Sequence, residues 1–287
     1  MKLIYNGVEV KHVIYNGVEV NEVYYDNVKV FPSLPTPGKA LNNYTWEEIQ
    51  MIAQAGVGDD YFNVGDRKAV TLNGSIYGVS YSGTRYCYII GFNHNAAKEG
   101  NNTIHFMFGT DALSGGNYKA FIHKYQTYGN VDTFSMNKSS SNTNVGGWAS
   151  CTMRNTTLPL LKNILPADLR SVLKKVTKYT DNTGNKSDLA ANVTATQDDI
   201  FLLAEYEVYG VRSLANQYEQ NYQQQYEFYR LGGTKIMKHD NNNAIRWYLR
   251  SPRYNSNVSY CAPQENGNIG AQNASQSYGL VPGFVVG

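Results

Sequence analysis

Residues 69–92 read AVTLNGSIYGVSYSGTRYCYIIGF, and this stretch decides the fold class. β-Branched and aromatic residues fill short runs that are interrupted by Asn-Gly and Ser-Gly pairs. Such runs between turn residues are typical of antiparallel strands. The pattern predicts strands over 69–72, 76–81 and 85–92, and a fourth over 103–108 after an Asn/Gly-rich break.

Helical patterns lie on both sides of these strands. Residues 45–48, Thr-Trp-Glu-Glu, have the form of a capping box, and a helix is expected from there to Gly56. Residues 158–176 have helical spacing, with Pro166 at the start of a second helix. Another helix is expected over 213–231, where tyrosines recur at helical spacing. These tyrosines are Tyr218, Tyr222, Tyr226 and Tyr229.

Further short strands are expected at 199–203, 247–249 and 280–286, where apolar residues run together. Helices are thus scattered among strands that have the pattern of antiparallel pairs. This arrangement indicates an α+β fold class.

A ten-residue repeat precedes this region. It reads IYNGVEV at 4–10 and at 14–20, and YYDNVKV at 24–30. Asn-Gly between β-branched and aromatic residues predicts tight hairpins. We therefore divide the chain into a β-strand repeat module for attachment or assembly (1–31), a Pro-rich linker (32–38) and a main domain (39–287). A plain β-meander that decorates the main domain is the alternative for the repeats.

Composition excludes several classes of protein. The 287 residues are 42% hydrophobic and 17% charged, too apolar for a disordered chain, and the net charge of +2 gives no basic field for nucleic acid. We expect neither a nucleic-acid partner nor membrane insertion, because no apolar run reaches about 20 residues. No signal peptide is expected, which indicates synthesis in the cytoplasm.

No motif points to catalysis or to a bound metal. The cysteines, Cys87, Cys151 and Cys261, form no CxxC pair and are expected to be buried free thiols. No histidine pattern of a metal site and no P-loop, GxGxxG or GxSxG motif is present. We therefore expect a protein that is not an enzyme, with no catalytic residues, no metal and no cofactor. The histidines are His12, His94, His105, His123 and His239.

The stretch 253–278 has almost no secondary-structure pattern and is expected to be a long loop. It is rich in Asn, Ser, Tyr and Gln, the composition of surfaces that bind through rigid aromatic anchors and adaptable amides. It is predicted to be a recognition surface, with a solvated loop as the alternative. The predicted ligand-binding residues are Arg253, Tyr254, Asn255, Asn257, Ser259, Tyr260, Gln264, Asn266, Asn268, Gln272, Asn273, Ser275, Gln276 and Tyr278.

Motifs spread over residues 40–287 resemble a domain family of gut Firmicutes and their phages. They are Trp-Ala-Ser at 148–150, Met-Arg at 153–154, Leu-Pro at 165–166, residues 199–203 with Glu207 and Gly210, Trp-Tyr-Leu-Arg-Ser-Pro at 247–252, and Gly-Leu-Val-Pro-Gly-Phe at 279–284. The resemblance implies a C-type-lectin-like fold. Some members of that family resemble the variable proteins of diversity-generating retroelements, in which Asn codons near the C-terminus are replaced.

This resemblance implies a hypervariable, receptor-binding protein of a phage tail, displayed on a virion and binding a protein or glycan on a host or target cell surface. Virion tail components and a homo-oligomer are the other expected partners. The alternative function is a structural tail or cell-surface component with no dedicated ligand site. A third possibility, an oxidase-like enzyme of the same fold, requires a reactive Cys261.

Overall fold

The computed structural model describes residues 4–6, 8–10, 12–16, 18–20, 23–25, 28–31, 34–110, 120, 134–138, 140–238 and 243–287. Within these ranges helices are interspersed with several small antiparallel sheets and one larger sheet. The α+β fold class is therefore confirmed. In the same part of the chain, no helix combines the length and the apolar character that a membrane span requires.

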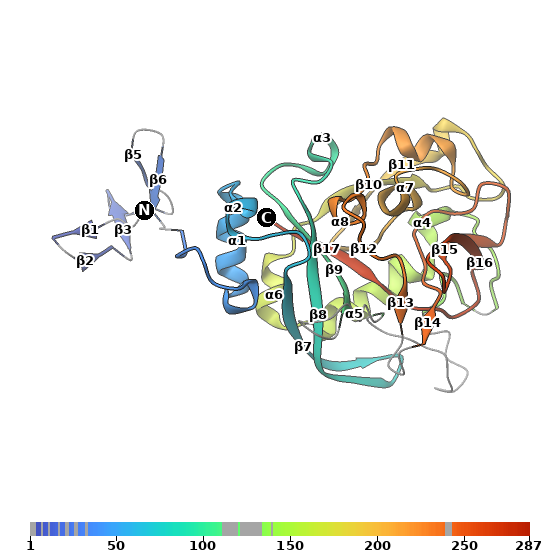
Figure 1. Cartoon of the computed structure of the whole chain (residues 1–287), viewed down its shortest axis with the longest axis horizontal. Coiled ribbons are helices and arrows are strands. Elements are labelled where there is room, and N and C mark those ends of the chain that lie inside the picture. The colour runs from blue at the N-terminus through green and yellow to red at the C-terminus, as the bar shows by residue number, and fades with distance from the viewer. Residues whose placement is uncertain are drawn as a thin grey trace.

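The start of the chain forms three two-stranded hairpins, which Figure 1 shows at one end of the molecule. They pair β1 (Ile4–Tyr5) with β2 (Val8–Glu9), β3 (Val13–Tyr15) with β4 (Val18–Val20), and β5 (Val23–Tyr25) with β6 (Val28–Phe31). Asn6 and Asn16 have φ values of 52° and 51°, as a type I′ turn requires. The predicted strands are confirmed, whereas the remaining turn residues, Gly7, Gly17, Asp26 and Asn27, lie outside the described residues.

Part of the predicted linker lies against the main domain. The hydroxyl of Tyr44 donates to the Thr36 carbonyl oxygen at 2.8 Å, and the hydroxyl of Tyr61 donates to the Pro35 carbonyl oxygen at 2.7 Å. Pro32 and Ser33 lie outside the described residues. The division of the chain at residues 31 and 38 stays a prediction.

A five-stranded antiparallel sheet organises the main domain. Its strand order is β12 (Ile200–Leu202), β17 (Pro282–Val286), β9 (Ile104–Thr110), β8 (Val79–Phe92) and β7 (Arg67–Ile76). The strands predicted at 199–203, 280–286 and 103–108 are confirmed. Because β17 lies between β12 and β9, the last strand of the chain joins the two parts of the sheet.

Within 69–92 the sequence predicts three strands, but the structure has two long ones, β7 and β8. The turn between them lies at Tyr77 and Gly78, which both have positive φ, and not at Asn73-Gly74 or Ser82-Gly83. Gly74 remains inside β7, where a Cβ atom would lie 2.5 Å from Cγ2 of Ile164. This glycine therefore permits close packing of the sheet on a helix and does not form a turn.

Both faces of the central sheet are buried, because side chains alternate between two hydrophobic clusters. On β8, Cys87 and Ile89 belong to the first cluster, whereas Tyr88 and Ile90 belong to the second. The first cluster holds the longer helices. The second holds Trp247, Leu249 and Val281 of the C-terminal motifs, whereas Tyr248, Leu280 and Phe284 belong to the first.

The helices of the first face agree with the sequence. The helix α1 (Trp46–Gln54) begins with the predicted capping box, in which the Glu48 amide donates to Oγ1 of Thr45 at 3.1 Å and the Thr45 amide donates to Glu48. Residues 158–176 form α5 (Leu158–Ile164) and α6 (Ala167–Val172), separated at Pro166 as expected, and the π-helical turn η2 (Met153–Thr157) precedes them. The second helix ends earlier than expected, because Val176 begins β10 (Val176–Asp181), which pairs with β11 (Val193–Asp198).

The helix predicted over 213–231 is wrong. This segment forms the 3-10 turn η4 (Gln217–Asn221) and the short helix α8 (Glu227–Arg230). The side chain of Asn216 accepts from the Tyr218 amide and starts a separate turn, while Tyr226 and Tyr229 are buried against the sheet. The spacing of these tyrosines is therefore not evidence of a helix, because Tyr226 and Tyr229 are buried although the segment is irregular.

The remaining elements are short. They are η1 (Leu41–Asn43), α2 (Gly58–Tyr61), α3 (Ala96–Glu99), α4 (Gly147–Ser150), η3 (Ala190–Asn192), α7 (Glu205–Tyr209), and the strand pair β13 (Met237–Lys238) and β14 (Ala244–Ile245). In place of the strand predicted at 247–249, the structure has an isolated parallel bridge between Trp247 and Gly279.

Candidate functional site

The segment 253–278 contains a hairpin. The strand β15 (Ser259–Pro263) pairs with β16 (Ile269–Asn273) over five residue pairs. The prediction of one long loop is wrong, because every residue of β15 is buried and core packing orders a sequence of low strand propensity. Loops remain at 253–258, 264–268 and 274–278.

The predicted ligand-binding residues differ in exposure. The exposed ones are Asn255, Asn257, Asn266, Asn268 and Gln276. The half-buried ones are Arg253, Tyr254, Gln264, Gln272, Asn273, Ser275 and Tyr278. Ser259 and Tyr260 are buried, and the Tyr260 hydroxyl donates to the Gly147 carbonyl oxygen at 2.9 Å. The prediction of Tyr260 as a surface anchor and of Ser259 as a ligand contact is therefore wrong, since both side chains belong to the interior.

The hairpin divides the remaining residues into two groups. Asn257 and Asn273 lie near one end of it, where Ala274 donates its amide to the Val258 carbonyl oxygen. The turn at 264–268 lies at the other end, about 16 Å away for a strand of five residues. The structure therefore does not bring Gln264, Asn266 and Asn268 together with the residues of 253–257.

Asn144 holds the first group in place, and its role was not visible in the sequence. Its amide donates to the Asn257 carbonyl oxygen, and its Nδ2 donates to the carbonyl oxygens of Ser256 and Ser259, all at 2.8 Å. Its Oδ1 accepts from the amide of Asn185 at 2.9 Å. The side chain is fully buried and uses both of its amide protons and its oxygen. Three segments distant in sequence are thereby joined.

Tyr254 connects this group to a fourth segment. Its amide donates to the Leu214 carbonyl oxygen at 2.9 Å, and the guanidinium of Arg212 lies 4.1 Å from its ring centroid. Arg212 also pairs with Asp188 at 3.1 Å. The half-buried tyrosine is therefore held by a cation–π contact that is itself fixed by an ion pair.

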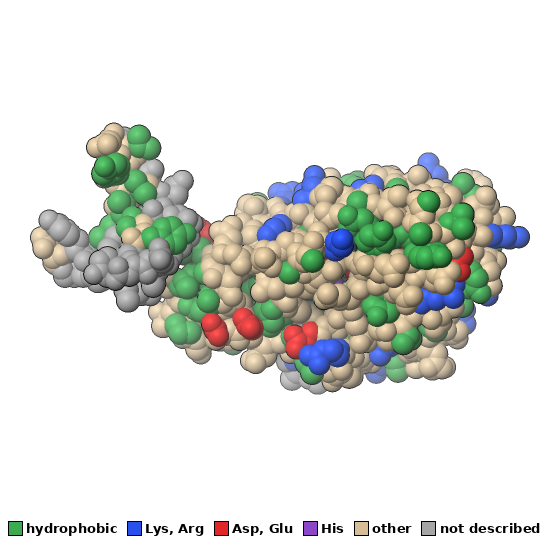
Figure 2. Space-filling model, turned by 90° about the horizontal axis from the view of Figure 1, so that it is seen from above, with side chains coloured by type: hydrophobic (Ala, Val, Ile, Leu, Met, Phe, Trp, Pro, Cys, Tyr) green, Lys and Arg blue, Asp and Glu red, His purple; other side chains and the backbone are tan. Residues whose placement is uncertain are grey.

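Exposed aliphatic side chains flank these contacts. Val145, Leu189 and Val211 are 53%, 63% and 59% exposed, and each is a chain neighbour of a residue in the network. We call the surface formed by residues 142–145, 185–189, 211–214 and 253–257 the end face. In Figure 2, hydrophobic side chains gather in patches on the main domain, among scattered Lys and Arg side chains.

A buried layer of charges lies beside the central sheet. Arg250 contacts both carboxylate oxygens of Glu207, at 2.5 and 2.7 Å, and Lys178 contacts Glu99 at 2.5 Å and Glu207 at 3.4 Å. The four side chains are at most 1% exposed. Burial alone would raise the pKa of Glu207, but Arg250 and Lys178 hold this pKa well below its ordinary value. Two cations balance two carboxylates, so the layer is electrically neutral.

The same layer contains the ligand atoms of a possible metal site. One ligand atom each from His94, Glu99 and Glu207 lies within 4.8 Å of the others, and Nε2 of His94 has no hydrogen-bond partner among the residues that the structure describes. However, the ammonium of Lys178 already contacts both carboxylates. A metal ion would have to displace this ammonium. The expectation of no metal stays a prediction.

Glu219 links the charged layer to the end face. Its carboxylate accepts from the Ser251 hydroxyl at 2.6 Å and from the Asp181 amide at 2.9 Å. Asp181 in turn accepts from the amides of Thr183 and Gly184 and from Nδ2 of Asn216. Burial raises the pKa of Glu219 to about 7. Glu219, a buried titratable group, therefore helps to fix the loops of the end face through Ser251 and Asp181.

The three cysteines are free and buried, as predicted. Burial raises the pKa of the Cys151 thiol to about 12 and the pKa of Cys261 well above its ordinary value. A thiolate is the reactive form of cysteine, and it is disfavoured at both positions. The structure gives no support to a reactive Cys261.

Several of the motif residues serve the scaffold. Nε1 of Trp148 and Nε of Arg154 donate to the two oxygens of Asp198, at 3.0 and 2.6 Å. Trp247, Leu249 and Phe284 are fully buried, as expected for side chains that support a surface.

Residues 119–287 match one family model, described as Domain of unknown function (DUF6273). No curated protein and no solved structure matches the chain.

Proposed function

Because the chain belongs to the DUF6273 family, we propose its function from its own residues: it is a non-enzymatic binding protein whose ligand site is the end face. One observation carries the proposal. The buried Asn144 and the Glu219 network fix loops whose outward side chains are a tyrosine, amides and aliphatic groups. Rigid support below adaptable contacts is the arrangement that gives affinity at low entropic cost.

The ligand is a macromolecule on a host or target cell surface, either a protein or a glycan. Three exposed aliphatic side chains, each next in sequence to a residue that holds the loop 253–257, favour a protein, because they offer apolar area and no hydrogen bonds to sugar hydroxyls. The affinity of a single end face for its ligand is expected to be modest. Many copies of the chain on one particle would raise the overall avidity.

The finer proposal is a C-type-lectin-like domain carried on a phage tail, with the repeats as attachment module and a homo-oligomer as the functional unit. Two features support it: the late strand β17, which lies between β12 and β9 in the main sheet, and a separate hairpin, β15–β16, that carries the Asn-rich segment. The sequence resemblance supplies the rest of this proposal.

Alanine substitution tests the end face. Tyr254→Ala combined with Leu189→Ala and Val211→Ala should reduce binding of the labelled chain to a panel of gut bacterial cells by at least tenfold. Leu231→Ala is the matched control, because Leu231 is equally exposed, at 63%, and follows α8. Unchanged binding by a folded triple variant would refute the end face as the site.

Diversification by a retroelement has its own test. Deep sequencing of codons 253–278 in the source population, with a search for a template copy nearby, should find substitutions at exposed positions such as Asn255, Asn257 and Gln276. The buried codons of β15 should not vary. A uniform segment would contradict diversification and leave the binding proposal standing on the end face alone.

The second candidate is a structural tail or cell-surface component that acts through its repeats. The hairpins favour it, because β3 and β4 expose Ile14, Tyr15 and Val18 and a lone hairpin is marginally stable in water. Deletion of residues 1–31 separates the two proposals. If the protein is a structural component, the deletion abolishes assembly, and residues 38–287 alone do not bind cells. If it is a binding protein, residues 38–287 still bind cells.

A further inference from the structure

Lys178 is a buried amine in direct contact with a carboxyl group. Its Nζ lies 2.5 Å from Oε2 of Glu99, and the two side chains are 0% and 1% exposed. The ring of Phe201 covers the amine, with its centroid 4.0 Å from Nζ. Lys178 lies on β10 and Glu99 ends α3, so the contact joins residues 79 positions apart in the chain. Burial disfavours the charged forms of both groups, and transfer of one proton along this contact makes both neutral.

A second carboxylate lies beside the amine and has different partners. Oε1 of Glu207 lies 3.4 Å from Nζ of Lys178. Arg250 contacts both oxygens of Glu207, and the Ala204 amide donates to its Oε2 at 2.9 Å. These donors hold Glu207 in its ionised form, in which a carboxylate is a poor electrophile and a good proton acceptor. The two carboxyl groups next to Lys178 are therefore suited to different tasks.

The other oxygen of Glu99 also has a donor. Nδ2 of Asn95 donates to Oε1 of Glu99 at 3.5 Å, whereas Lys178 contacts Oε2. A donor at Oε1 stabilises the negative charge that develops on this oxygen when a nucleophile attacks the carboxyl carbon. A nucleophile, an acceptor carbon, a proton acceptor and a hydrogen-bond donor thus lie in one buried cluster. Because the fold holds them in contact, their reaction is intramolecular and has a small entropic cost.

We propose that Lys178 and Glu99 condense to an intramolecular isopeptide bond, with Glu207 as the residue that transfers a proton. One proton moves from Nζ to Oε2 of Glu99, and the neutral amine attacks Cδ of Glu99. Glu207 takes a second proton from Nζ and delivers it to the departing oxygen. The Nζ–Cδ bond forms, the Cδ–Oε2 bond breaks, one water leaves, and Glu207 is regenerated. The reaction is a dehydration, so it needs neither an oxidant nor a reductant.

The product keeps the charged layer neutral. Condensation removes one buried cation and one buried carboxylate, while Arg250 continues to balance Glu207. The bond ties α3, which precedes the segment that matches the family model, to β10 within that segment. A covalent link across so long a loop restricts the unfolded chain, as a disulfide does. All three cysteines are free, so the isopeptide bond takes the place of a disulfide in this chain.

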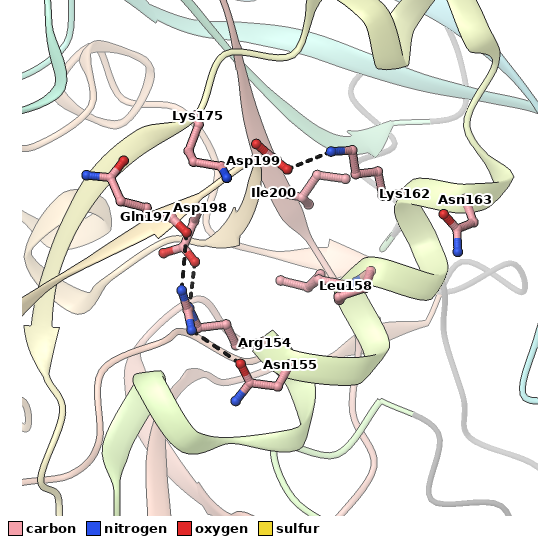
Figure 3. Close-up of a pocket in the computed structure, with 11 residues that line it drawn as sticks. Arg154, Asn155, Leu158, Lys162, Asn163, Lys175, Gln197, Asp198, Asp199 and Ile200 are labelled. Carbon is pink, nitrogen blue, oxygen red and sulfur yellow. Dashed lines mark hydrogen bonds and ion pairs between the residues drawn. The ribbon is translucent and has the colours of Figure 1, made fainter.

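Another contact between a lysine and a carboxylate provides a matched comparison. Nζ of Lys162 lies 2.6 Å from Oδ2 of Asp199, but the two side chains are 35% and 27% exposed. Figure 3 shows this pair beside a hollow that both residues line. Water therefore reaches both groups, and Lys162 contacts no second carboxylate within the described part of the chain. Lys162 is expected not to condense.

Intact-mass spectrometry of the purified full chain, after denaturation, tests the proposal. The mass should be about 18 Da below the value for the sequence, which corresponds to one water per chain. Trypsin should then release residues 99–119 joined to residues 176–186, because the modified Lys178 is no longer cleaved. A mass equal to that of the sequence would overturn the proposal. A loss of water that maps to other peptides would overturn it as well.

Two substitutions identify the reacting lysine. Lys178→Met removes the nucleophile, so this variant should have the full mass of its own sequence. Lys162→Met removes the exposed lysine and should keep the loss of one water. Loss of water in Lys178→Met, or its absence in Lys162→Met, would contradict the assignment. The joined peptides of the parent chain test the same bond without depending on whether either variant folds.

Discussion

Arg250 and Glu207 form a bidentate ion pair that has no exposure to solvent, with N–O distances of 2.5 and 2.7 Å. Arg250 comes from the Trp-Tyr-Leu-Arg-Ser-Pro motif, and Glu207 lies on α7. Arg250 also donates to the Leu202 carbonyl oxygen and to the Thr180 hydroxyl. One guanidinium therefore ties together the C-terminal motif, α7, β10 and β12.

Removal of this guanidinium should destabilise the chain strongly. Arg250→Met leaves Glu207 buried with Lys178 as its remaining cation, and loss of one partner of a buried pair costs about 3–5 kcal/mol. Urea unfolding measures the loss. Arg246→Met is the control, because the Arg246–Glu265 pair is partly exposed and should contribute less than about 1 kcal/mol. Similar losses for the two variants would contradict a structural role for the buried pair.

Glu219 should make stability depend on pH. Its pKa is about 7 in the folded chain and about 4.5 in the unfolded chain, so between these values the folded state holds a proton that the unfolded state has lost. The free energy of unfolding therefore falls as the pH rises through this window, with a slope of at most about 1.4 kcal/mol for each pH unit.

The variant Glu219→Gln isolates this effect. The depressed pKa values of His94 and His105 act in the opposite direction below pH 6.5, but they are common to both proteins and cancel in the difference. The variant should gain stability relative to the parent by about 2–3 kcal/mol between pH 5 and pH 7.5. A difference that does not change with pH would show that Glu219 does not titrate in this range.

The family segment should not fold alone. Residues 119–287 include β12 and β17 but lack β9, which pairs with β17 and separates it from β8. Without β9, the aromatic stack of Phe106 on Phe284 is lost and an apolar sheet edge is open. Circular dichroism and hydrogen exchange should find a cooperative fold for residues 34–287 and none for 119–287. A folded 119–287 fragment would mean that the two parts of the sheet are separable.

The thiols should be protected in the native state. All three cysteines are buried, so a thiol reagent should label fewer than one per chain before unfolding and three in denaturant. Rapid native labelling of Cys261 would revive the oxidase-like possibility, because that chemistry needs an accessible thiolate.

Local signals predicted local structure well. The capping box at Thr45, the break at Pro166 and the positive φ of Asn6 and Asn16 in the repeats depend on neighbours in sequence, and the structure has them where the sequence places them. Asn73-Gly74 and Ser82-Gly83 are exceptions, because both pairs lie inside strands. Gly74 is required by its contact with Ile164, about ninety residues later, which no local pattern reveals.

The candidate site was predicted only in outline. The composition of 253–278 located one segment of the end face but not its hairpin, since Ser259–Pro263 and Ile269–Asn273 become strands through burial. Asn144 and Asp188 carry no signal in the sequence, because their roles depend on partners far along the chain. For the same reason Tyr260 was assigned to the surface although its ring is in the core.

The position of β17 between β12 and β9 bears on how the chain acquires its fold during synthesis. The ribosome releases β9 and β12 before β17, so neither strand has this partner until β17 has been synthesised. Pairing between such distant strands is slow, and an unpaired edge is prone to intermolecular association. The edges of β9 and β12 therefore need protection from such association, by a chaperone or by rapid translation, until β17 has emerged from the ribosome.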